Sequence, residues 1–190
     1  MITTVTTYYL EMFSPSALRR STVQPEDVRV ARVDPPSPAL NRYLYTAVGA
    51  GYYWIGRRSW SYQQWLDYLH HPAVETWLLT VRGIPAGYVE LDHREGDPEI
   101  AYFGLLPTQV GRGLGGYFLT AAVDRAWQMG GRRVWLHTCT LDHPSALPAY
   151  LARGFTLYDQ EVLEEDLPEQ APGPWEGCGP GWPEPPVKRG

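Results

Sequence analysis

The hydrophobic pattern of the amino-terminal part predicts two strands followed by two helices. Residues 4–12 and 28–33 are rich in Thr, Val and Tyr and alternate with a two-residue period, which is typical of half-buried strands. Helical spacing of apolar residues then predicts helices over residues 39–48 and 61–70, the first of them after a proline-rich stop. Between the two helices lies an aromatic loop, residues 52–60, of a kind that a folded protein rarely leaves bare.

The first of these strands is expected to be an edge strand. It lies within residues 1–27, which we interpret as an N-terminal extension ahead of a main domain at residues 28–167. After residue 167 the composition changes abruptly to Pro, Gly, Glu and Trp, so residues 168–190 are expected to form a tail without a core of its own. Trp175 and Trp182 could anchor that tail to the domain.

The remainder of the main domain predicts a strand meander followed by alternating helices and strands. The expected strands are 76–81, 86–91, 99–105, 133–138 and 155–162, and the expected helices are 114–129 and 144–152. Three consecutive strands followed by strand–helix alternation favour an α/β fold (α+β) built on one mixed sheet.

Composition indicates which kinds of function are excluded. The chain has 190 residues, which suits one domain, and its 44% of hydrophobic residues supply a core. A formal net charge of −5 gives no electrostatic basis for a nucleic-acid partner, and no apolar run is long enough to cross a bilayer. The N-terminus carries no secretion signal, and Cys139 and Cys178 lie far apart without neighbouring metal ligands. We therefore expect a cytoplasmic protein without a metal cofactor, a disulfide framework or a membrane partner.

The most informative segment is a glycine-rich turn at residues 105–116, which follows a predicted strand and opens a predicted helix. Glycines allow consecutive backbone N–H groups to point into one concavity, and a helix N-terminus adds partial positive charge, so the turn suits a phosphate or pyrophosphate. A P-loop is excluded because its lysine is missing. Gly111, Gly113 and Gly116 formally match a dinucleotide fingerprint, but the upstream meander differs from a Rossmann unit. A turn needed only for packing is the structural alternative.

Two motifs carry a resemblance to a known family. The run Val110-Gly111-Arg112-Gly113-Leu114-Gly115 resembles the Gln/Arg-x-x-Gly-x-Gly/Ala signature of the GNAT superfamily of acyl-CoA N-acyltransferases. Residues 143–155 resemble the Asn-x-x-Ala-x-x-x-Tyr-x-x-x-Gly-Phe block of the same family, with His143 at the position of the Asn. The resemblance covers about residues 28–162. It departs from the signature at Val110, where Gln109 comes one residue early.

The resemblance implies the GNAT fold, a central mixed and mostly antiparallel sheet flanked by helices, with acetyl-CoA as co-substrate. In that family the amides of the glycine loop bind the pyrophosphate of coenzyme A. We expect a strand amide near residues 103–105 to hold the oxyanion, because a main-chain donor needs no particular side chain. The residues implied to contact the co-substrate are Phe103, Gly104, Leu105, Val110, Gly111, Arg112, Gly113, Leu114, Gly115, Gly116 and His143.

Two residues are the candidates for acid–base chemistry. Acetyl transfer to an amine needs a proton acceptor, because an alkyl amine with a pKa near 10.4 is charged at neutral pH. Glu99 opens its strand as the general-base Glu does in the histone-acetyltransferase branch of the family, and Glu90 and Asp92 on the preceding strand are the reserve candidates. The resemblance places the phenol of Tyr150 near the sulfur of coenzyme A, where it would protonate the departing thiolate. For both residues a purely structural role stays open.

Other polar residues are less informative. His137 could reach the cleft, but a lone histidine on a strand is more often a core residue, and Cys139 is interpreted as a packing residue. The acidic run at residues 161–166 is expected to be a solvated face, which could attract a cationic amine if it borders the acceptor cleft.

These observations predict an N-acetyltransferase that moves the acetyl group of acetyl-CoA to a primary amine by direct attack in a ternary complex. The alternatives are a non-catalytic CoA-binding sensor or interaction module and, less closely matched, a nucleotide-dependent oxidoreductase. The acceptor stays open among an antibiotic, a polyamine, an amino acid, a peptide N-terminus and a protein lysine. The oligomeric state is not determined, so a homodimer also stays open.

Overall fold

The computed structural model describes residues 1–174; Trp175 and Trp182, the expected anchors of the tail, lie outside the described residues. The strands are β1 (Ile2–Met12), β2 (Val28–Arg32), β3 (Val74–Val81), β4 (Ile84–Asp92), β5 (Glu99–Leu105), β6 (Val134–Cys139) and β7 (Thr156–Asp166). The helices are α1 (Pro38–Gly49), α2 (Tyr62–Leu69), α3 (Leu114–Gln128) and α4 (Ala146–Ala152), with short 3-10 turns at Pro15–Ala17, Ala50–Tyr52 and Pro107–Gln109.

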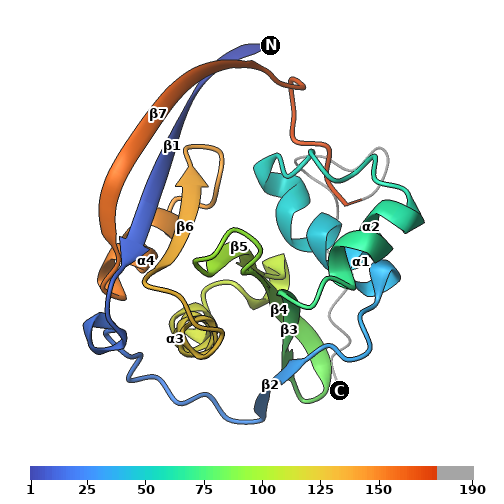
Figure 1. Ribbon diagram of the computed structural model, residues 1–190. Helices are drawn as coiled ribbons and strands as arrows, with labels where there is room; N and C mark the ends of the chain where they lie inside the picture. Colours follow the sequence, from blue (N-terminus) through green and yellow to red (C-terminus); the bar gives the residue numbers. More distant parts are fainter. Residues whose placement is uncertain (175–190) are drawn as a thin grey trace.

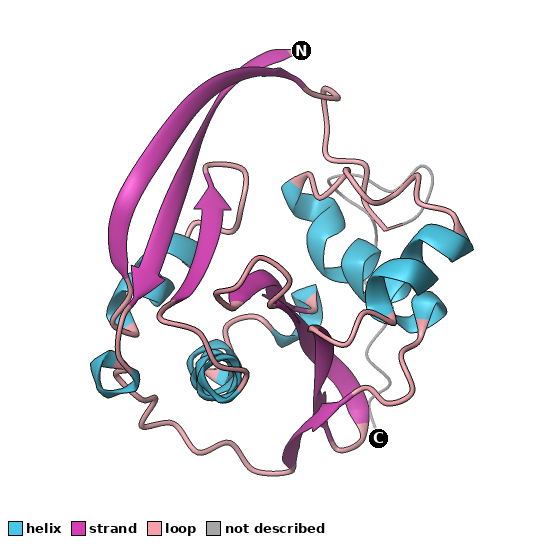
Figure 2. Ribbon diagram, in the orientation of Figure 1, coloured by secondary structure: helices cyan, strands magenta, loops and turns pink. Residues whose placement is uncertain are grey.

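All seven strands belong to one mixed sheet with the order β2-β3-β4-β5-β6-β1-β7. The neighbours are antiparallel except β5 and β6, which are parallel. The predicted fold class is therefore confirmed: an α/β protein with a mixed, mostly antiparallel sheet flanked by helices (Figure 2). No helix of the described chain combines the length and apolarity needed to span a membrane.

The expectation that the first strand lies at a sheet edge is wrong. Strand β1 pairs with β6 on one side and with β7 on the other, so it is an interior strand that holds the last strand to the sheet (Figure 1). Local alternation predicts that a segment is a strand but contains no information about its neighbours, because pairing partners lie far away in sequence. The same pairing extends β7 beyond the predicted residue 162, since its ladder continues to the Ile2–Asp166 pair.

The sheet separates into two halves between β5 and β6. The two strands form only one ladder pair, Glu99 with Trp135, and diverge beyond it (Figure 1). Close to this point the pairing of β5 with β4 shifts register, so that Ala101 is one extra residue between the pairs Leu91–Ile100 and Glu90–Tyr102. Such a bulge bends the strand and changes which face the side chains point to. As a consequence, Ile100 and Tyr102 pack into different cores although they are two residues apart.

Two hydrophobic cores cover the two faces of the sheet. The larger core packs helix α3 against one face of the sheet around Phe118, Leu119 and Leu136. The smaller core packs helices α1 and α2 against the other face around Leu44 and Trp65. Helix α1 packs closely against the sheet because β5 has a glycine, Gly104, at the point of contact. A Cβ atom at Gly104 would lie 2.3 Å from Cγ1 of Val48. The helices therefore lie directly over the strand that borders the separation.

The interior position of β1 leads to a prediction about the free energy of unfolding. Leu10 is fully buried between Leu136 of β6 and Leu157 of β7, whereas Ile2 on the same strand is 66% exposed. We expect Leu10→Ala to lower the free energy of unfolding by about 2–5 kcal/mol, because it leaves a cavity in the core. Ile2→Ala should change it by about 0.5 kcal/mol or less. Denaturant unfolding measures both, and an equally small effect of the two variants would contradict the assignment of β1 to the core.

Candidate active site

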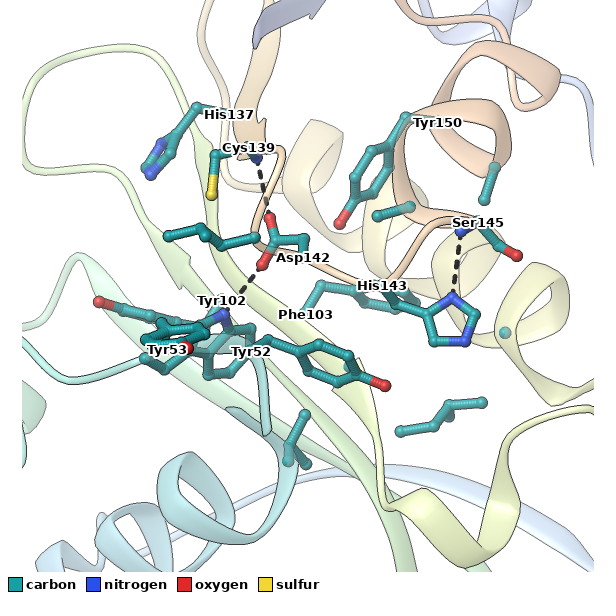
Figure 3. A pocket seen from close by; sticks show the side chains of 18 of the residues that line it. Tyr52, Tyr53, Tyr102, Phe103, His137, Cys139, Asp142, His143, Ser145 and Tyr150 are labelled. Atoms are coloured by element: carbon teal, nitrogen blue, oxygen red, sulfur yellow. Dashed lines mark hydrogen bonds between the residues drawn. The ribbon is translucent and has the colours of Figure 1, made fainter. Parts of the chain in front are cut away.

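A cavity of about 570 Å³ occupies the separation between β5 and β6. Its walls come from residues of β5, β6 and β1, the loop after α1, the glycine-rich turn before α3, and the start of α4. The side chains around it come from segments far apart in the sequence (Figure 3). Because two parallel strands part here, backbone groups along the facing edges lack a strand partner, and such groups require a hydrogen bond from elsewhere.

The glycine-rich turn lies at one end of this cavity. Gly111 and Gly113 have φ angles of 80° and 75°, left-handed values that favour glycine. Gly113 is the N-cap of α3 and makes no side-chain capping hydrogen bond, so the first-turn amides of this helix are open to a ligand. The arrangement is that of an anion-binding helix N-terminus.

The structure brings most of the predicted co-substrate residues to this cavity. Those that line it are Phe103, Gly104, Leu105, Val110, Gly111, Gly113, Leu114, Gly115 and His143. Two of the predicted residues do not line it. The guanidinium of Arg112 donates to Oε1 of Gln109 at 2.7 Å, and Gly116 lies against the guanidinium of Arg153.

Tyr150 borders the cavity from helix α4. Its ring packs against Phe103 of β5, and the residue is only 7% exposed. Figure 3 shows its hydroxyl directed into the cavity, and within residues 1–174 no side chain hydrogen-bonds to it. Burial raises the pKa of this phenol, and the negative charge of Asp142 adds to the effect, so the hydroxyl keeps its proton at neutral pH.

Glu99 lies at the closed end of the separation, where β5 and β6 still pair. Its Oε1 atom is 3.2 Å from Nδ1 of His137, which comes from β6 and lines the cavity. The hydrogen bond to Glu99 raises the pKa of His137, although burial acts in the opposite direction. The two residues lie 38 positions apart in the sequence, and the fold brings them together as one acid–base pair.

Several residues of the site were not found from the sequence. The indole Nε1 of Trp54 donates to Asp142 at 3.1 Å, and the same carboxylate accepts from Oγ1 of Thr138 and from the backbone amide of Cys139. These bonds join the loop after α1 to the loop after β6 (Figure 3). The aromatic loop was the available signal, because such a segment needs a partner, but the sequence does not say which one.

His143 has a structural role in the same region. Its Nδ1 atom accepts a hydrogen bond from the backbone amide of Ser145 at 3.1 Å, and its ring lies edge-to-face against Tyr52 with centroids 5.9 Å apart. The residue therefore orders the entry into α4 and contacts the aromatic loop, in addition to lining the cavity.

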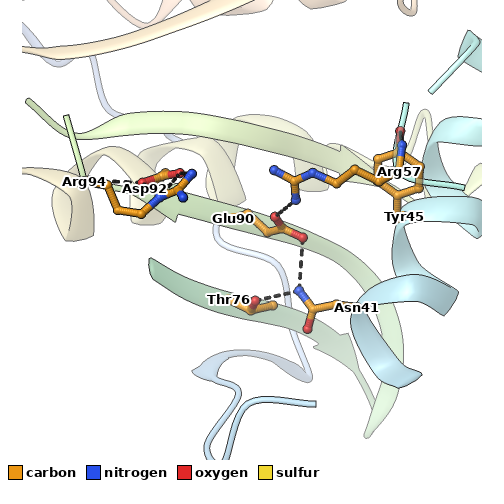
Figure 4. Close-up of polar contacts among 7 residues, drawn as sticks. All are labelled: Asn41, Tyr45, Arg57, Thr76, Glu90, Asp92 and Arg94. Atoms are coloured by element: carbon orange, nitrogen blue, oxygen red, sulfur yellow. Dashed lines mark hydrogen bonds and ion pairs between the residues drawn. The ribbon is translucent and has the colours of Figure 1, made fainter. Parts of the chain in front are cut away.

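The reserve candidates Glu90 and Asp92 already have cationic partners (Figure 4). Glu90 is 0% exposed and accepts from Arg57 at 2.6 Å and from the Asn41 amide at 3.0 Å. Asp92 is bound by Arg94, which helps to hold the pKa of that carboxyl below its usual value against the effect of burial. Neither carboxylate lines the cavity.

Arg57 is enclosed by aromatic rings as well as paired with Glu90. Its guanidinium carbon lies 4.1 Å from the ring centroid of Tyr68, 4.5 Å from that of Tyr102 and 4.6 Å from that of Trp60. Burial disfavours the charge of this guanidinium, but the carboxylate of Glu90 and the phenols of Tyr68 and Tyr102 together outweigh that effect, so the pKa of Arg57 is raised. The pair fixes the loop after α1 to the sheet.

The acidic carboxyl-terminal strand divides between two faces. Glu161 pairs with Thr7, and Glu165 lies four residues further along the strand, on the same face. Thr7 and Glu165 both line the cavity. Glu164 accepts a hydrogen bond from Thr4 on the other face. In residues 1–174 no group of three or more His, Cys, Asp or Glu side chains is arranged to hold a metal ion.

Comparison with known proteins identifies the family. The family model described as acetyltransferase (GNAT) family matches residues 41–155, which is more than half of the chain. The chain therefore belongs to the GNAT acetyltransferase family. No curated protein matches it by sequence.

Solved structures of low sequence identity share its fold. A GCN5-related N-acetyltransferase from Sphaerobacter thermophilus is 17% identical with a TM-score of 0.62, and the match covers 84% of this chain and 50% of that one. One from Kribbella flavida is 18% identical with a TM-score of 0.59, covering 85% and 58%. The spermidine N-acetyltransferase of Vibrio cholerae, solved with CoA and spermine, is 16% identical with a TM-score of 0.55, covering 70% and 82%. The chain thus spans about half the length of the Sphaerobacter protein.

The buried ion pair of Arg57 and Glu90 leads to a second prediction about the free energy of unfolding. Arg57→Met leaves a buried carboxylate without its cation, so we expect the free energy of unfolding to fall by about 3–5 kcal/mol. Adding Glu90→Gln should recover part of that loss, because the unpaired charge is removed. Arg82 and Asp27 form an exposed ion pair, and Arg82→Met should cost about 1 kcal/mol or less. A double variant less stable than Arg57→Met would contradict this account.

Proposed function

We propose that this protein transfers the acetyl group of acetyl-CoA to a primary amine by direct attack in a ternary complex. The observation that carries the proposal is a single cavity between β5 and β6 that contains the glycine-rich turn, the Tyr150 hydroxyl and the His137 imidazole paired with Glu99. A site suited to an acyl donor and an acid–base pair in the same cavity favour direct transfer of the acetyl group. They argue against a module that only binds coenzyme A.

The glycine-rich turn is the proposed site of the pyrophosphate. The first amides of α3 provide donors and partial positive charge there without a basic side chain. The pantetheine would continue along the facing edge of β5, where backbone groups past Glu99 have no ladder partner in the described chain. Backbone amides near Phe103 to Leu105 are the proposed donors to the oxyanion, since they need no particular side chain.

A proton donor for the departing thiolate and a proton acceptor for the attacking amine are both part of the proposal. Tyr150 is the proposed proton donor to the departing thiolate, because its hydroxyl is protonated and directed into the cavity. Glu99 supplies the negative charge of the proton-accepting pair at the closed end. Holding the amine and the thioester together would itself contribute up to about 7–11 kcal/mol of the barrier.

The acceptor is proposed to be an amine that is cationic in solution. Glu165 lines the cavity, and the Glu161 carboxylate on the same strand face lies 3.4 Å from the Tyr9 hydroxyl. Carboxylates at the border of a cleft raise the local concentration of cations. The fold shared with the spermidine N-acetyltransferase of Vibrio cholerae supports an amine acceptor. We place the reaction in the cytoplasm, which supplies acetyl-CoA and suits the free thiol of Cys139.

The proposal is tested by release of free thiol from acetyl-CoA in the presence of a panel of amines: spermidine, tyramine, lysine methyl ester and a peptide with a free N-terminus. An amine-dependent rate supports an acetyltransferase. Binding of acetyl-CoA without release of thiol for any amine would favour the sensor or interaction module. A melting shift with NAD(P)H but none with acetyl-CoA would favour the oxidoreductase.

The position of Gly115 allows a prediction about acetyl-CoA binding that does not depend on a change in folding. A Cβ atom there would meet only Leu105 at 3.8 Å, and the residue lies in the first turn of α3 without a left-handed φ angle. We expect Gly115→Val to fold normally but to reduce the stabilisation by acetyl-CoA, which is about 2.7 kcal/mol at 100 times the dissociation constant. Ala121→Val on the same helix is the matched control. Unchanged acetyl-CoA affinity in folded Gly115→Val would contradict the pyrophosphate site.

Tyr150→Phe isolates the proposed proton donor. The variant keeps the ring that packs on Phe103 and removes only the hydroxyl. We expect kcat to fall by about 10²-fold or more, while the affinity for acetyl-CoA changes little, because the hydroxyl acts only as the thiolate leaves. Thiol release with the most reactive amine of the panel and a melting titration measure the two quantities. Full activity of Tyr150→Phe would return this residue to a packing role.

A further inference from the structure

His137 is the more accessible partner of the acid–base pair. Its side chain is 47% exposed, whereas that of Glu99 is 20% exposed, and only His137 lines the cavity. Its position on β6 is two residues beyond the Glu99–Trp135 ladder pair, at the point where the strands begin to diverge. Figure 3 shows its ring projecting from β6 on the same side of that strand as Cys139. A ligand in the cavity therefore reaches the imidazole before the carboxylate.

We propose that the imidazole of His137 is the catalytic group that takes the proton from the attacking amine, and that Glu99 is its positioning residue. The inference rests on the proposed function, since it names the proton acceptor of that same reaction. It differs from direct proton transfer to Glu99, which the sequence favoured.

The contact between Nδ1 of His137 and Oε1 of Glu99 selects the tautomer that a base needs. An ionised carboxylate only accepts hydrogen bonds, so the Nδ1 atom facing Glu99 at 3.2 Å is the donor. In the neutral imidazole the Nε2 atom then carries the free lone pair. The rings of Tyr9 and Trp135 hold the imidazole on its other sides, with centroids at 6.1 and 6.4 Å.

The charges around His137 determine its expected pH dependence. The groups that face it are Glu99 from β5, Asp142 from the loop after β6 and the Tyr9 hydroxyl from β1, to which Glu161 of β7 is hydrogen-bonded. The cation of this region is Arg133, which lies beyond the Trp135 ring. The interaction of the His137 ring with the Glu99 carboxylate is the main cause of the raised pKa of His137. Since only the neutral ring accepts a proton, the rate should rise with pH through a value above 6.5.

The proton balance of the step is complete without a further reactant. The amine is cationic in solution and first loses one proton to solvent. The free amine then attacks the carbonyl carbon of the thioester, the C–N bond forms, and the nitrogen loses a second proton to Nε2 of His137. The C–S bond breaks, and the thiolate takes the proton of the Tyr150 hydroxyl. His137 then releases its proton to solvent, and Tyr150 regains a proton from solvent. The net change is that one amide and one thiol replace one amine and one thioester.

The first test is an NMR titration of imidazole-labelled protein from pH 5 to 9. The His137 resonance is the one missing from His137→Gln. We expect the Nδ1–H tautomer and a pKa above 6.5 in the wild type, and a fall of that pKa toward 6.5 in Glu99→Gln, which keeps an acceptor but removes the charge. An Nε2–H tautomer, or a pKa unchanged in Glu99→Gln, would overturn the inference. This readout does not depend on turnover, so it stands apart from failure of the proposed function, which would appear as absent acetyl-CoA binding or as binding without thiol release for any amine.

The second test is the pH profile of kcat/KM for thiol release, with the most reactive amine of the panel or with water as the acceptor. His137→Gln should lower the rate by about 10²–10⁴-fold and remove the dependence on the His137 pKa. Glu99→Gln should lower it less and move the acidic limb to lower pH. The exposed His70 at the end of α2 provides the control His70→Gln, which should keep the wild-type profile. A wild-type rate in His137→Gln, or a larger loss in Glu99→Gln than in His137→Gln, would overturn the assignment.

Discussion

The separation of β5 from β6 after a single ladder pair is the constraint on which the rest of this structure depends. Two parallel strands that part leave donors and acceptors along both edges, and buried backbone groups without partners cost free energy comparable to a lost hydrogen bond. The protein keeps that opening because the larger core contains residues from both halves of the sheet, such as Leu91 of β4 and Leu136 of β6, and so holds the halves together. Helices α1 and α2 cover one side with their own core, and α3 joins the larger core across the other. An elongated ligand with alternating hydrogen-bonding groups fits such an opening, which agrees with membership of an acyl-CoA-dependent family.

Three acidic residues near the opening differ in what they can do because they differ in their partners. Glu90 is enclosed and holds Arg57, and Asp92 is bound by Arg94, so both carboxylates are used for stability. Glu99 instead has a histidine as its partner, at the boundary of the cavity. A guanidinium stays charged at every pH of interest, whereas an imidazole gains and loses a proton near neutrality. Of these three carboxylates, only Glu99 has a partner that can exchange a proton near neutral pH.

The interior position of β1 connects the start of the described chain to the chemistry. Val5 and Thr7 of this strand line the cavity, and Tyr9 packs on His137. A segment interpreted from the sequence as an extension of the domain thus forms part of the site wall. It also pairs with β7, whose carboxylates Glu161 and Glu165 are on the cavity side, so the proposed acceptor region depends on pairing between residues more than 150 positions apart in the sequence.

The sequence by itself determined the elements and the glycine-rich turn. Strand 99–105 was predicted with its exact bounds, and other predicted ends differ by a few residues, because local periodicity and glycine placement encode local conformation. It also placed Gly111, Gly113 and Tyr150 in motifs that the structure brings to one cavity. Only the tertiary structure decided that β1 is interior, that Trp54 binds Asp142, and that Glu99 meets His137. Each of these is a contact between segments far apart in the chain, and no local pattern specifies which distant segment will satisfy a given hydrogen bond or charge.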